Sequence, residues 1–223
     1  LSKFFYKWVD QVVTLTQKDK EQFDKFHSKV IVIPNFSPFP IVPDLPLSSK
    51  KIVTIGRLTD QKNYLHLLKA WKKIYQMIPE WCLNIYGEGE HKKMLQDYIE
   101  RNSLQHVILK GSTSNVQEVY KQSDFFVMSS KYEGLPMVLV EAQSFGLPIV
   151  SYDCPFGPSD VIQDHKNGLL VENQNIEALA DAILQLASSS NMLAEFSQNS
   201  LVNAKKYQPE QILKVWIEKV LEG

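Results

Sequence analysis

Short β-branched or aromatic runs alternate with longer amphipathic runs along most of this chain, and this alternation constrains the fold more than any other feature. The run "KIVTI" at 51–55 precedes a stretch at 64–78 whose apolar residues recur at helical spacing. The segment 124–130 contains "FFVM", an unbroken apolar run that is typical of a strand covered on both faces. Strand–helix repetition with short connections favours right-handed βαβ units. The sequence therefore predicts an α/β fold with a doubly wound, mostly parallel, Rossmann-like sheet.

The same patterns place further elements along the chain. Strands are expected at 82–86, 106–111, 147–153 and 168–171, and helices at 90–104, 114–122, 136–145 and about 157–163, before three C-terminal helices.

Residues 1–48 follow a different pattern. Strands are expected at 11–15 and 29–33, with a polar helix at about 17–27 between them. The segment "PNFSPFPIVPDLPLSSK" then carries five prolines in 17 residues, which neither a helix nor a central strand accommodates. The chain begins "LSKFF", with no methionine and no signal-peptide pattern. We therefore expect a linker after about residue 35, preceded by the remnant of another domain.

Composition excludes several classes of function. The chain has 24 basic and 25 acidic residues, a balance that argues against general binding to nucleic acid or to a membrane surface. No apolar run reaches the roughly 18 residues of a membrane span. The two cysteines and five histidines have no metal-ligand spacing, and no D-x-D pair is present to hold a divalent metal. A reduced, cytoplasmic setting without an obligatory metal is the expectation.

Cations follow the predicted strand at 51–55. Ligands of open parallel sheets bind beyond the carboxyl ends of the strands. Gly56 allows the chain to turn close to a ligand there, and Arg57 and Lys62 come next. A planar guanidinium and a point-charge ammonium suit a phosphate or a diphosphate. The alternative is that both are ordinary solvated surface cations.

The segment "GEGE" at 87–90 has two glycines but lacks the third one of a dinucleotide-binding loop. Its acidic residues would also repel a pyrophosphate. A tight turn that leads into a helix is the favoured interpretation.

Two glutamates stand eight positions apart in "KYEGLPMVLVEAQSFG". Pro136 suits the first position of a helix whose free amides, from Met137 to Leu139, would attract an anion. Glu141 would lie about 7 Å along this helix, which suits hydrogen bonds to ribose hydroxyls, and Glu133 would stand beside the same anion site. The alternative is that Glu133 offsets the helix dipole and Glu141 is solvated.

Several segments resemble one known family when taken together. They are "VTIGRLTDQKN", "LNIYGEGE", "VILKG", "SSKYEGLPMVLVEAQSFGLPIVSYDCPFGPSDVI" and "NGLLV". In this order they resemble the retaining, GT-B-fold glycosyltransferases, which include sucrose-type synthases and many bacterial polysaccharide and lipopolysaccharide transferases. The resemblance covers about residues 50–205, the C-terminal donor-binding domain of that family, and joins Glu133 and Glu141 into its E-x7-E motif.

The resemblance implies a role for each matching residue. Glu133 would contact the donor sugar near the reacting centre, while Arg57 and Lys62 would stabilise the departing diphosphate; these three are the expected catalytic residues. Glu141 would bind the ribose, and the loop near Thr113 would touch the base. The remaining substrate-binding positions are Gly56, Gly134, Leu135, Pro136, Met137 and Val138.

The resemblance also implies the organisation and function of the whole enzyme. Residues 1–35 would be the remnant of an N-terminal acceptor domain, 36–49 a linker, 50–205 the nucleotide-sugar-binding domain and 206–223 a C-terminal crossover helix. The expected reaction is transfer of a hexosyl unit, with retention, from a UDP-sugar to a sugar or lipid-linked acceptor at the cytoplasmic face of the membrane. Without its acceptor domain the chain is expected to be inactive. A sugar-nucleotide epimerase and a non-catalytic nucleotide-binding module are the alternatives.

Overall fold

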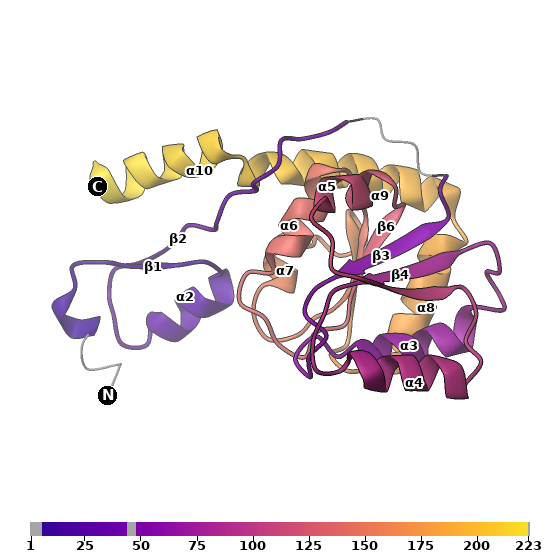
Figure 1. The fold of residues 1–223 in the computed structure, drawn as a ribbon. Coiled ribbons are helices and arrows are strands. Elements are labelled where there is room, and N and C mark those ends of the chain that lie inside the picture. The colour runs from indigo at the N-terminus through magenta and orange to yellow at the C-terminus, as the bar shows by residue number, and fades with distance from the viewer. Residues whose placement is uncertain (1–5, 44–47, 223) are drawn as a thin grey trace.

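In the computed structural model, which describes residues 6–43 and 48–222, six parallel strands form one sheet in the order β5-β4-β3-β6-β7-β8. Figure 1 shows this sheet at the centre of the larger body. The predicted doubly wound α/β fold is confirmed. The strands are β3 (Lys51–Ile55), β4 (Cys82–Tyr86), β5 (Val107–Gly111), β6 (Phe125–Met128), β7 (Ile149–Tyr152) and β8 (Gly168–Val171).

Helices cover both faces of this sheet. One face packs against α3, α4 and α8, and the other against α5, α6 and α7, with α9 against α6. The helices are α3 (Tyr64–Ile74), α4 (Lys92–Arg101), α5 (Val116–Lys121), α6 (Met137–Ser144), α7 (Pro158–Val161), α8 (Ile176–Ala187) and α9 (Ser190–Ala204).

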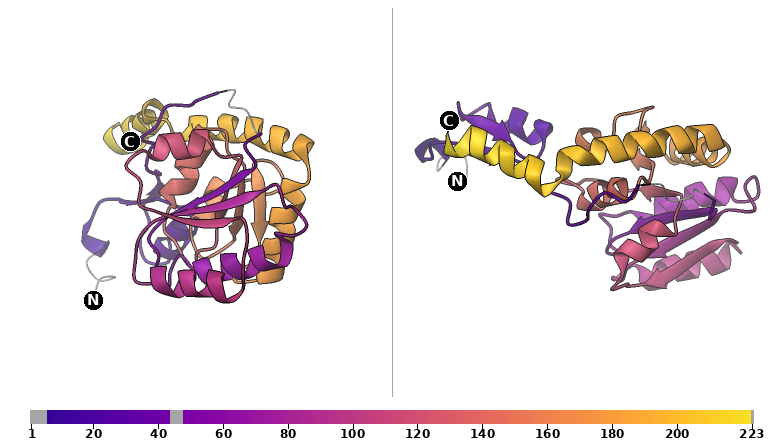
Figure 2. Two further views of the ribbon diagram at one scale, coloured as in Figure 1. Left: turned by 45° about the vertical axis from the view of Figure 1, so that its right-hand side comes forward. Right: turned by 90° about the horizontal axis from the view of Figure 1, so that it is seen from above.

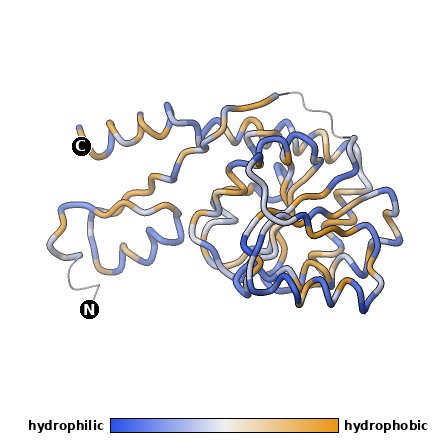
Figure 3. The backbone as a smooth tube through the Cα atoms, in the orientation of Figure 1, coloured by the Kyte–Doolittle hydropathy of each residue, from blue (hydrophilic) through white to orange (hydrophobic). Residues whose placement is uncertain are grey.

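The unbroken apolar run in β6 is explained by this two-sided cover. Phe125 and Val127 belong to the core on the α3 face, and Phe126 and Met128 belong to the core on the α6 face. All four side chains are at most 3% exposed. In Figure 3 the strands of the sheet are mostly hydrophobic, whereas the helices around them alternate between hydrophobic and hydrophilic positions. Burial on both faces holds β6 at the centre of the sheet.

Several helices are shorter than the sequence predicts. The helix expected at 64–78 ends at Ile74 and gives way to turns before Pro79. The one expected at 90–104 ends at Arg101, and Ser103 takes a left-handed conformation with φ of 47°. The polar helix expected to reach residue 27 is α2 (Gln17–Phe23). These differences lie at helix ends, where the conformations that turn residues prefer outweigh the periodic hydrophobic pattern.

The N-terminal segment forms a small unit of its own. It contains η1 (Tyr6–Trp8), β1 (Val12–Thr14), α2 and β2 (Val30–Val32), and β1 pairs only with β2, in parallel. Beside this unit lie α10 (Pro209–Trp216) and the π-helical turn η3 (Ile217–Leu221), as two views in Figure 2 show. The side-chain amide of Gln11 donates to the Lys219 carbonyl oxygen at 3.4 Å. The described N-terminal and C-terminal segments therefore meet away from the six-stranded sheet.

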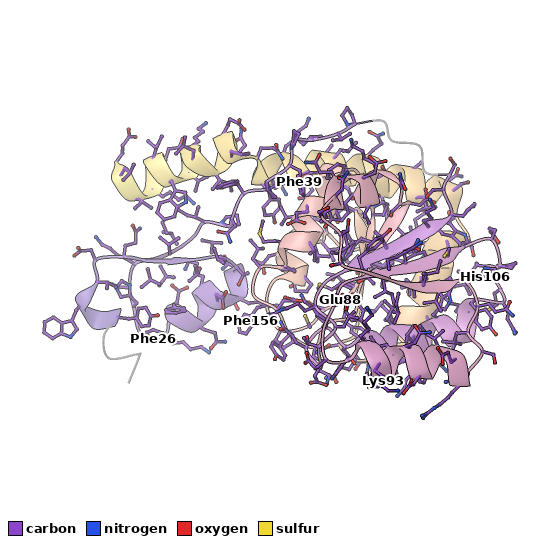
Figure 4. The ribbon with its side chains drawn as sticks, in the orientation of Figure 1. Phe26, Phe39, Glu88, Lys93, His106 and Phe156 are labelled. Atoms are coloured by element: carbon purple, nitrogen blue, oxygen red, sulfur yellow. The ribbon has the colours of Figure 1, made fainter. Side chains whose placement is uncertain are left out.

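The predicted linker at 36–49 falls partly outside the described residues. Its described parts, 36–43 and 48–49, contain neither helix nor strand. The linker is held to the larger body by the Ser37 hydroxyl, 2.9 Å from that of Ser144, and by Phe39, whose ring packs edge-on against Phe145. Figure 4 places Phe39 at this junction. The division of the chain at residues 35, 49 and 205 remains a prediction.

The strand order fixes where a ligand fits. The chain moves outward from β3 through β4 to β5, then crosses back to β6 on the other side of β3. The loops after β3 and β6 therefore leave the same edge of the sheet in opposite directions. Such a reversal point opens a crevice beyond the carboxyl ends of the strands.

Candidate functional site

The loops that follow β3 and β6 are joined by an ion pair between two predicted site residues. The ammonium nitrogen of Lys62 lies 2.6 Å from Oε1 of Glu133, and the two side chains are 19% and 9% exposed. Around this pair, the Ser129 hydroxyl donates to the Lys62 carbonyl oxygen at 2.9 Å, and the Lys131 amide donates to the Gln61 carbonyl oxygen at 2.8 Å. Two residues 71 positions apart are thereby held in contact at the sheet edge.

A cleft of about 490 Å³ opens beside these loops. Gly56 and Arg57 line it from the end of β3, and Ser112 and Thr113 line it from the loop after β5. The Arg57 side chain is exposed and makes no ion pair or hydrogen bond within the described part of the chain. Arg57 is therefore free to bind an anion in a cleft of the size that small ligands occupy.

The segment "GEGE" forms a turn that packs against the β3 loop. A Cβ added to Gly87, whose φ is 149°, would lie 1.9 Å from the Gly56 carbonyl oxygen. The Leu58 amide donates to the Glu88 carbonyl oxygen at 2.8 Å, and the Glu88 carboxylate pairs with Lys92 at 2.8 Å. The structure thus shows the tight turn that the sequence favours. Glycine is needed because the two loops touch through their backbones.

The start of α6 differs slightly from its prediction. Pro136 precedes the helix in an extended conformation, with φ of −75° and ψ of 94°, so Met137 is the first helical residue. The Leu139 amide donates to the Pro136 carbonyl oxygen at 2.9 Å. Its N–H is therefore engaged, whereas those of Met137 and Val138 have no acceptor among the described residues. Two free amides at a helix N-terminus make a weak anion site.

Glu141 has a partner that the sequence did not indicate. The hydroxyl of Tyr120, a fully buried residue of α5, donates to Oε2 of Glu141 at 2.9 Å. Burial raises the pKa of Glu141 above its ordinary value, and the Tyr120 hydrogen bond partly opposes this rise. The solvated alternative for Glu141 is wrong, because the carboxylate is half-buried and anchored. Its Oε1 has no hydrogen-bond partner in the described structure and can still accept from a ligand.

The loop after β7 supports the segment that carries Glu133. A Cβ added to Gly157 would lie 1.9 Å from the Gly134 carbonyl oxygen and 2.4 Å from Cδ of Pro136, and its φ is 87°. The Glu133 amide donates to the Pro155 carbonyl oxygen at 3.3 Å. The backbone from Glu133 to Pro136 therefore rests directly on this loop. Gly134 is exposed, whereas Leu135 and Pro136 are buried.

The same β7 loop, with the short helix α7 that follows it, also contacts the small N-terminal unit. The Gln17 amide at the start of α2 donates to Oδ1 of Asp160 at 2.6 Å, and Lys18 pairs with Asp153 at 3.3 Å. Figure 4 labels Phe156 on this side of the larger body. Cys154 in this loop is buried, and its pKa is raised to about 12 by burial, Glu133 and Asp153. Its thiol stays protonated and unreactive.

The structure thus brings most predicted site residues to one edge of the sheet. Gly56, Arg57 and Thr113 line the cleft, and Lys62 and Glu133 form the ion pair beside it. Sequence reasoning missed the contributions of Tyr120 and Ser129. Tyr120 carries no local signal, because an aromatic residue on a helix is usually part of the core. The binding roles of the predicted site residues stay predictions.

Neither a metal-binding cluster nor a membrane-spanning helix is present among the described residues. Within residues 6–43 and 48–222, no three histidine, cysteine, aspartate or glutamate side chains gather in a way that would hold a metal ion. Of the helices that the structure describes, none has both the length and the apolar character to cross a bilayer.

Comparison with known proteins assigns a family to this arrangement. The family model "Glycosyl transferases group 1" matches residues 37–201. The amylovoran biosynthesis glycosyltransferase AmsD of Erwinia amylovora is 35% identical over 226 residues, which cover 97% of this chain and 63% of AmsD.

Solved structures agree with this result. A Staphylococcus aureus TarM mutant in complex with fondaparinux, alpha-GlcNAc-glycerol and UDP superposes with a TM-score of 0.87 at 30% identity, covering 97% of this chain and 45% of TarM. The pneumococcal O-GlcNAc transferase GtfA in complex with UDP and GlcNAc gives a TM-score of 0.82 at 26% identity, over 98% of this chain and 47% of GtfA.

The match covers almost all of this chain but only part of each relative. This chain spans from about half to about two thirds of the length of these relatives, so it corresponds to part of each. Within that part, the family model and the fold both confirm the resemblance seen in the sequence. The chain belongs to the group 1 glycosyl transferases.

Proposed function

We propose that this chain binds the nucleotide-diphosphate sugar, a UDP-sugar, of a retaining hexosyltransferase that builds a cell-surface polysaccharide or lipopolysaccharide. The main support is the placement of Arg57, the Lys62–Glu133 pair and the first turn of α6 at the reversal point of the sheet. A ligand in this crevice meets cations, free amides and a carboxylate together. That combination suits a diphosphate joined to two polyhydroxylated groups.

In this proposal the cations stabilise the departing nucleotide. Arg57 has no competing carboxylate partner among the residues that the structure describes, so its guanidinium binds the diphosphate directly. Lys62 contributes a second positive charge while it pairs with the Glu133 carboxylate beside the sugar. Negative charge grows on the diphosphate as the glycosidic bond breaks, and fixed cations lower the barrier to that step. No metal is required by this arrangement.

The same proposal assigns the nucleoside to the cleft. Glu141 accepts hydrogen bonds from ribose hydroxyls through Oε1, since Oε2 already accepts from Tyr120. The base lies near Thr113 in the loop after β5 and meets backbone groups there. The crystals of TarM and GtfA both contain UDP, which favours uridine over the other bases.

Retention of the anomeric configuration is supported by one relative, TarM, and by the position of Glu133. TarM was crystallised with UDP and alpha-GlcNAc-glycerol, an alpha-linked glycoside. The anomeric phosphate of UDP-N-acetylglucosamine is also alpha, so a transferase that joins them would retain configuration. Glu133 lies at the edge of the sheet where the donor sugar is expected, and its carboxylate can stabilise positive charge on that sugar.

The acceptor side of the reaction is assigned to a second domain. We propose the boundaries at residues 35, 49 and 205, with β1, α2 and β2 belonging to the acceptor half and α10 crossing back to it. On this basis the 223-residue chain binds donor but transfers little sugar alone, and the whole enzyme works in the cytoplasm on sugar or lipid-linked acceptors.

A calorimetric titration tests the donor assignment. UDP, GDP and ADP are each titrated into the chain, and UDP is expected to bind most tightly. Arg57→Ala should weaken UDP binding about tenfold or more, the loss expected for a charge-assisted hydrogen bond. Lys205→Ala, an exposed lysine just after α9, serves as the matched control. Equal binding of all three nucleotides, unchanged by Arg57→Ala, would contradict the proposal.

A second assay separates the reaction types. A longer protein that carries both halves is incubated with a UDP-hexose, with and without an acceptor. Acceptor-dependent release of UDP supports transfer. Formation of the epimeric UDP-hexose without acceptor supports an epimerase, and binding without turnover in either case supports a nucleotide-binding module.

A further inference from the structure

A second, more polar cavity lies beside the start of α3. Its volume is about 190 Å³, and neither Arg57 nor the Lys62–Glu133 pair contributes to its lining. We name it the α3 pocket. Its polar lining residues are Asp60, Asn63, His66, Lys69, His91 and Lys131.

Asn63 lines this pocket and carries an unpaired side-chain donor. The residue is 7% exposed, and its Nδ2 has no hydrogen-bond partner within the described structure. Asn63 precedes α3 in a left-handed conformation, with φ of 53°, and makes no side-chain capping bond. A buried amide without a partner costs free energy, so a ligand that accepts from Nδ2 gains a favourable contact.

The charges around the α3 pocket favour an anion. Lys131 pairs with Asp60 at 2.6 Å, which neutralises the one carboxylate in the lining. Lys69 is half-buried and has no ion pair in the parts of the chain that the structure describes. The N-terminus of α3, an 11-residue helix, adds a partial positive charge at Asn63. The lining therefore carries one uncompensated ammonium and a helix dipole of the same sign.

The environment of His66 is consistent with this positive field. Burial, followed by the charges of Lys69 and Lys131, holds the pKa of His66 below its ordinary value. Nδ1 of His66 lies 3.4 Å from the Tyr152 hydroxyl, whereas Nε2 has no partner in the structure as described. A cation would meet two lysines and one acid that is already paired. An oxyanion would meet several donors.

We propose that the α3 pocket binds a small oxyanion of the phosphate type, with Nδ2 of Asn63 and the ammonium of Lys69 as its main donors. The volume admits one tetrahedral anion but not a nucleotide, so this site is distinct from the donor cleft. Its loops are nonetheless shared with the candidate donor site. Asp60 precedes Lys62 by two positions, and Lys131 precedes Glu133 by two.

Calorimetry with inorganic phosphate, at constant ionic strength, tests the α3 pocket. The donor site also binds phosphate oxygens under the proposed function, so titrations use both UDP-saturated chain and the Arg57→Ala variant without UDP. Asn63→Gly tolerates the left-handed backbone and removes the amide donor without adding a charge. Lys69→Gln removes the charge, and Lys205→Ala is the control. The thermal midpoint of each variant reports on folding.

Phosphate is expected to bind UDP-saturated chain at one site. Asn63→Gly and Lys69→Gln should each weaken it roughly tenfold, while Lys205→Ala leaves it unchanged, and Arg57→Ala without UDP should still bind phosphate. The inference is overturned if no phosphate binds the UDP-saturated chain, if Arg57→Ala abolishes binding, or if Lys205→Ala weakens it as much as Lys69→Gln. Failure of UDP to bind would contradict only the donor assignment. The α3 pocket would still be tested, because the Arg57→Ala titration contains no UDP.

Discussion

The Lys62 ammonium lies 2.6 Å from Oε1 of Glu133, across the two loops that flank the reversal point of the sheet. Both side chains are largely buried, so each charge depends on the other for compensation. A donor diphosphate that binds Lys62 must therefore share it with Glu133. The same ion pair therefore contributes both to the stability of the two loops and to the chemistry proposed for them.

Lys62→Ala should reduce both stability and UDP affinity. Removing one partner of a buried pair leaves the Glu133 carboxylate uncompensated, at a cost of about 3 kcal/mol in the free energy of unfolding. For a chain of this length that corresponds to a fall of roughly 6–12 °C in Tm. UDP affinity should fall about tenfold or more as the phosphate loses a cation. Calorimetry measures both quantities.

The double variant Lys62→Ala with Glu133→Gln separates these effects. With no charge left to compensate, most of the lost stability should return, whereas UDP affinity should stay low. Recovery of UDP binding together with stability would mean that Lys62 has only a structural role.

The pH dependence of UDP binding should report on Glu141. Its pKa is raised from 4.5 by burial, so the carboxylate takes up a proton at a higher pH than an exposed glutamate. A protonated Glu141 is a poorer acceptor for ribose hydroxyls, so UDP affinity should fall as the pH drops through the raised pKa. Tyr120→Phe removes the hydrogen bond that lowers this pKa. The fall in affinity should then begin at a higher pH.

Glu141→Gln is the control for this pH profile. It cannot titrate, so this part of the pH dependence should disappear while the overall affinity is lower. A profile for Tyr120→Phe that coincides with the parent profile would rule out Tyr120 as a positioning residue for Glu141.

Gly157→Ala should disturb the segment around Gly134. The added Cβ would meet the Gly134 carbonyl oxygen at 1.9 Å, and alanine is strained at a φ of 87°. We expect a loss of about 1–3 kcal/mol in the free energy of unfolding, with weaker UDP binding. Gly134→Ala is the matched control for stability, because nothing lies within 4 Å of its added Cβ. Similar melting temperatures for the two variants would contradict the close backbone contact.

Asp124 offers a test of the fold apart from the site. This fully buried carboxylate precedes β6 and accepts hydrogen bonds from the amide and hydroxyl of Ser49 and from the Lys51 amide, at 3.0–3.2 Å. Asp124→Ala would strand these donors and should cost about 3 kcal/mol. Asp181→Ala, at an exposed position of α8, should change stability by less than about 0.5 kcal/mol. Chemical denaturation compares the two, and equal values would exclude a structural role for Asp124.

The sheet and the positions of Arg57 and Lys62 were predictable from sequence because both follow from local patterns. Strand-length apolar runs fix the βαβ order, and that order sends residues such as Arg57 to the carboxyl edge. The motif around Glu133 and Glu141 is also local. Helix ends such as Ile74 were less predictable, since turn geometry there competes with periodicity.

The contacts that join the site were not predictable, because they connect residues far apart in the chain. Lys62 and Glu133 are 71 positions apart, and Tyr120 and Glu141 are 21 apart. Nothing in the neighbourhood of Tyr120 distinguishes a core aromatic residue from one that holds a carboxylate. Such pairings require the three-dimensional arrangement of β3, α5 and β6.

The stretch 153–160, which runs from the β7 loop into α7, contacts two parts of the molecule. Asp153 and Asp160 at its two ends bind α2 of the small N-terminal unit, and the backbone of Gly157 between them lies close to that of Gly134. A rotation of that unit against the six-stranded sheet must strain these contacts before it can separate the two bodies. The anchoring of α2 and the support of the backbone that carries Glu133 therefore depend on the same eight residues, 153–160.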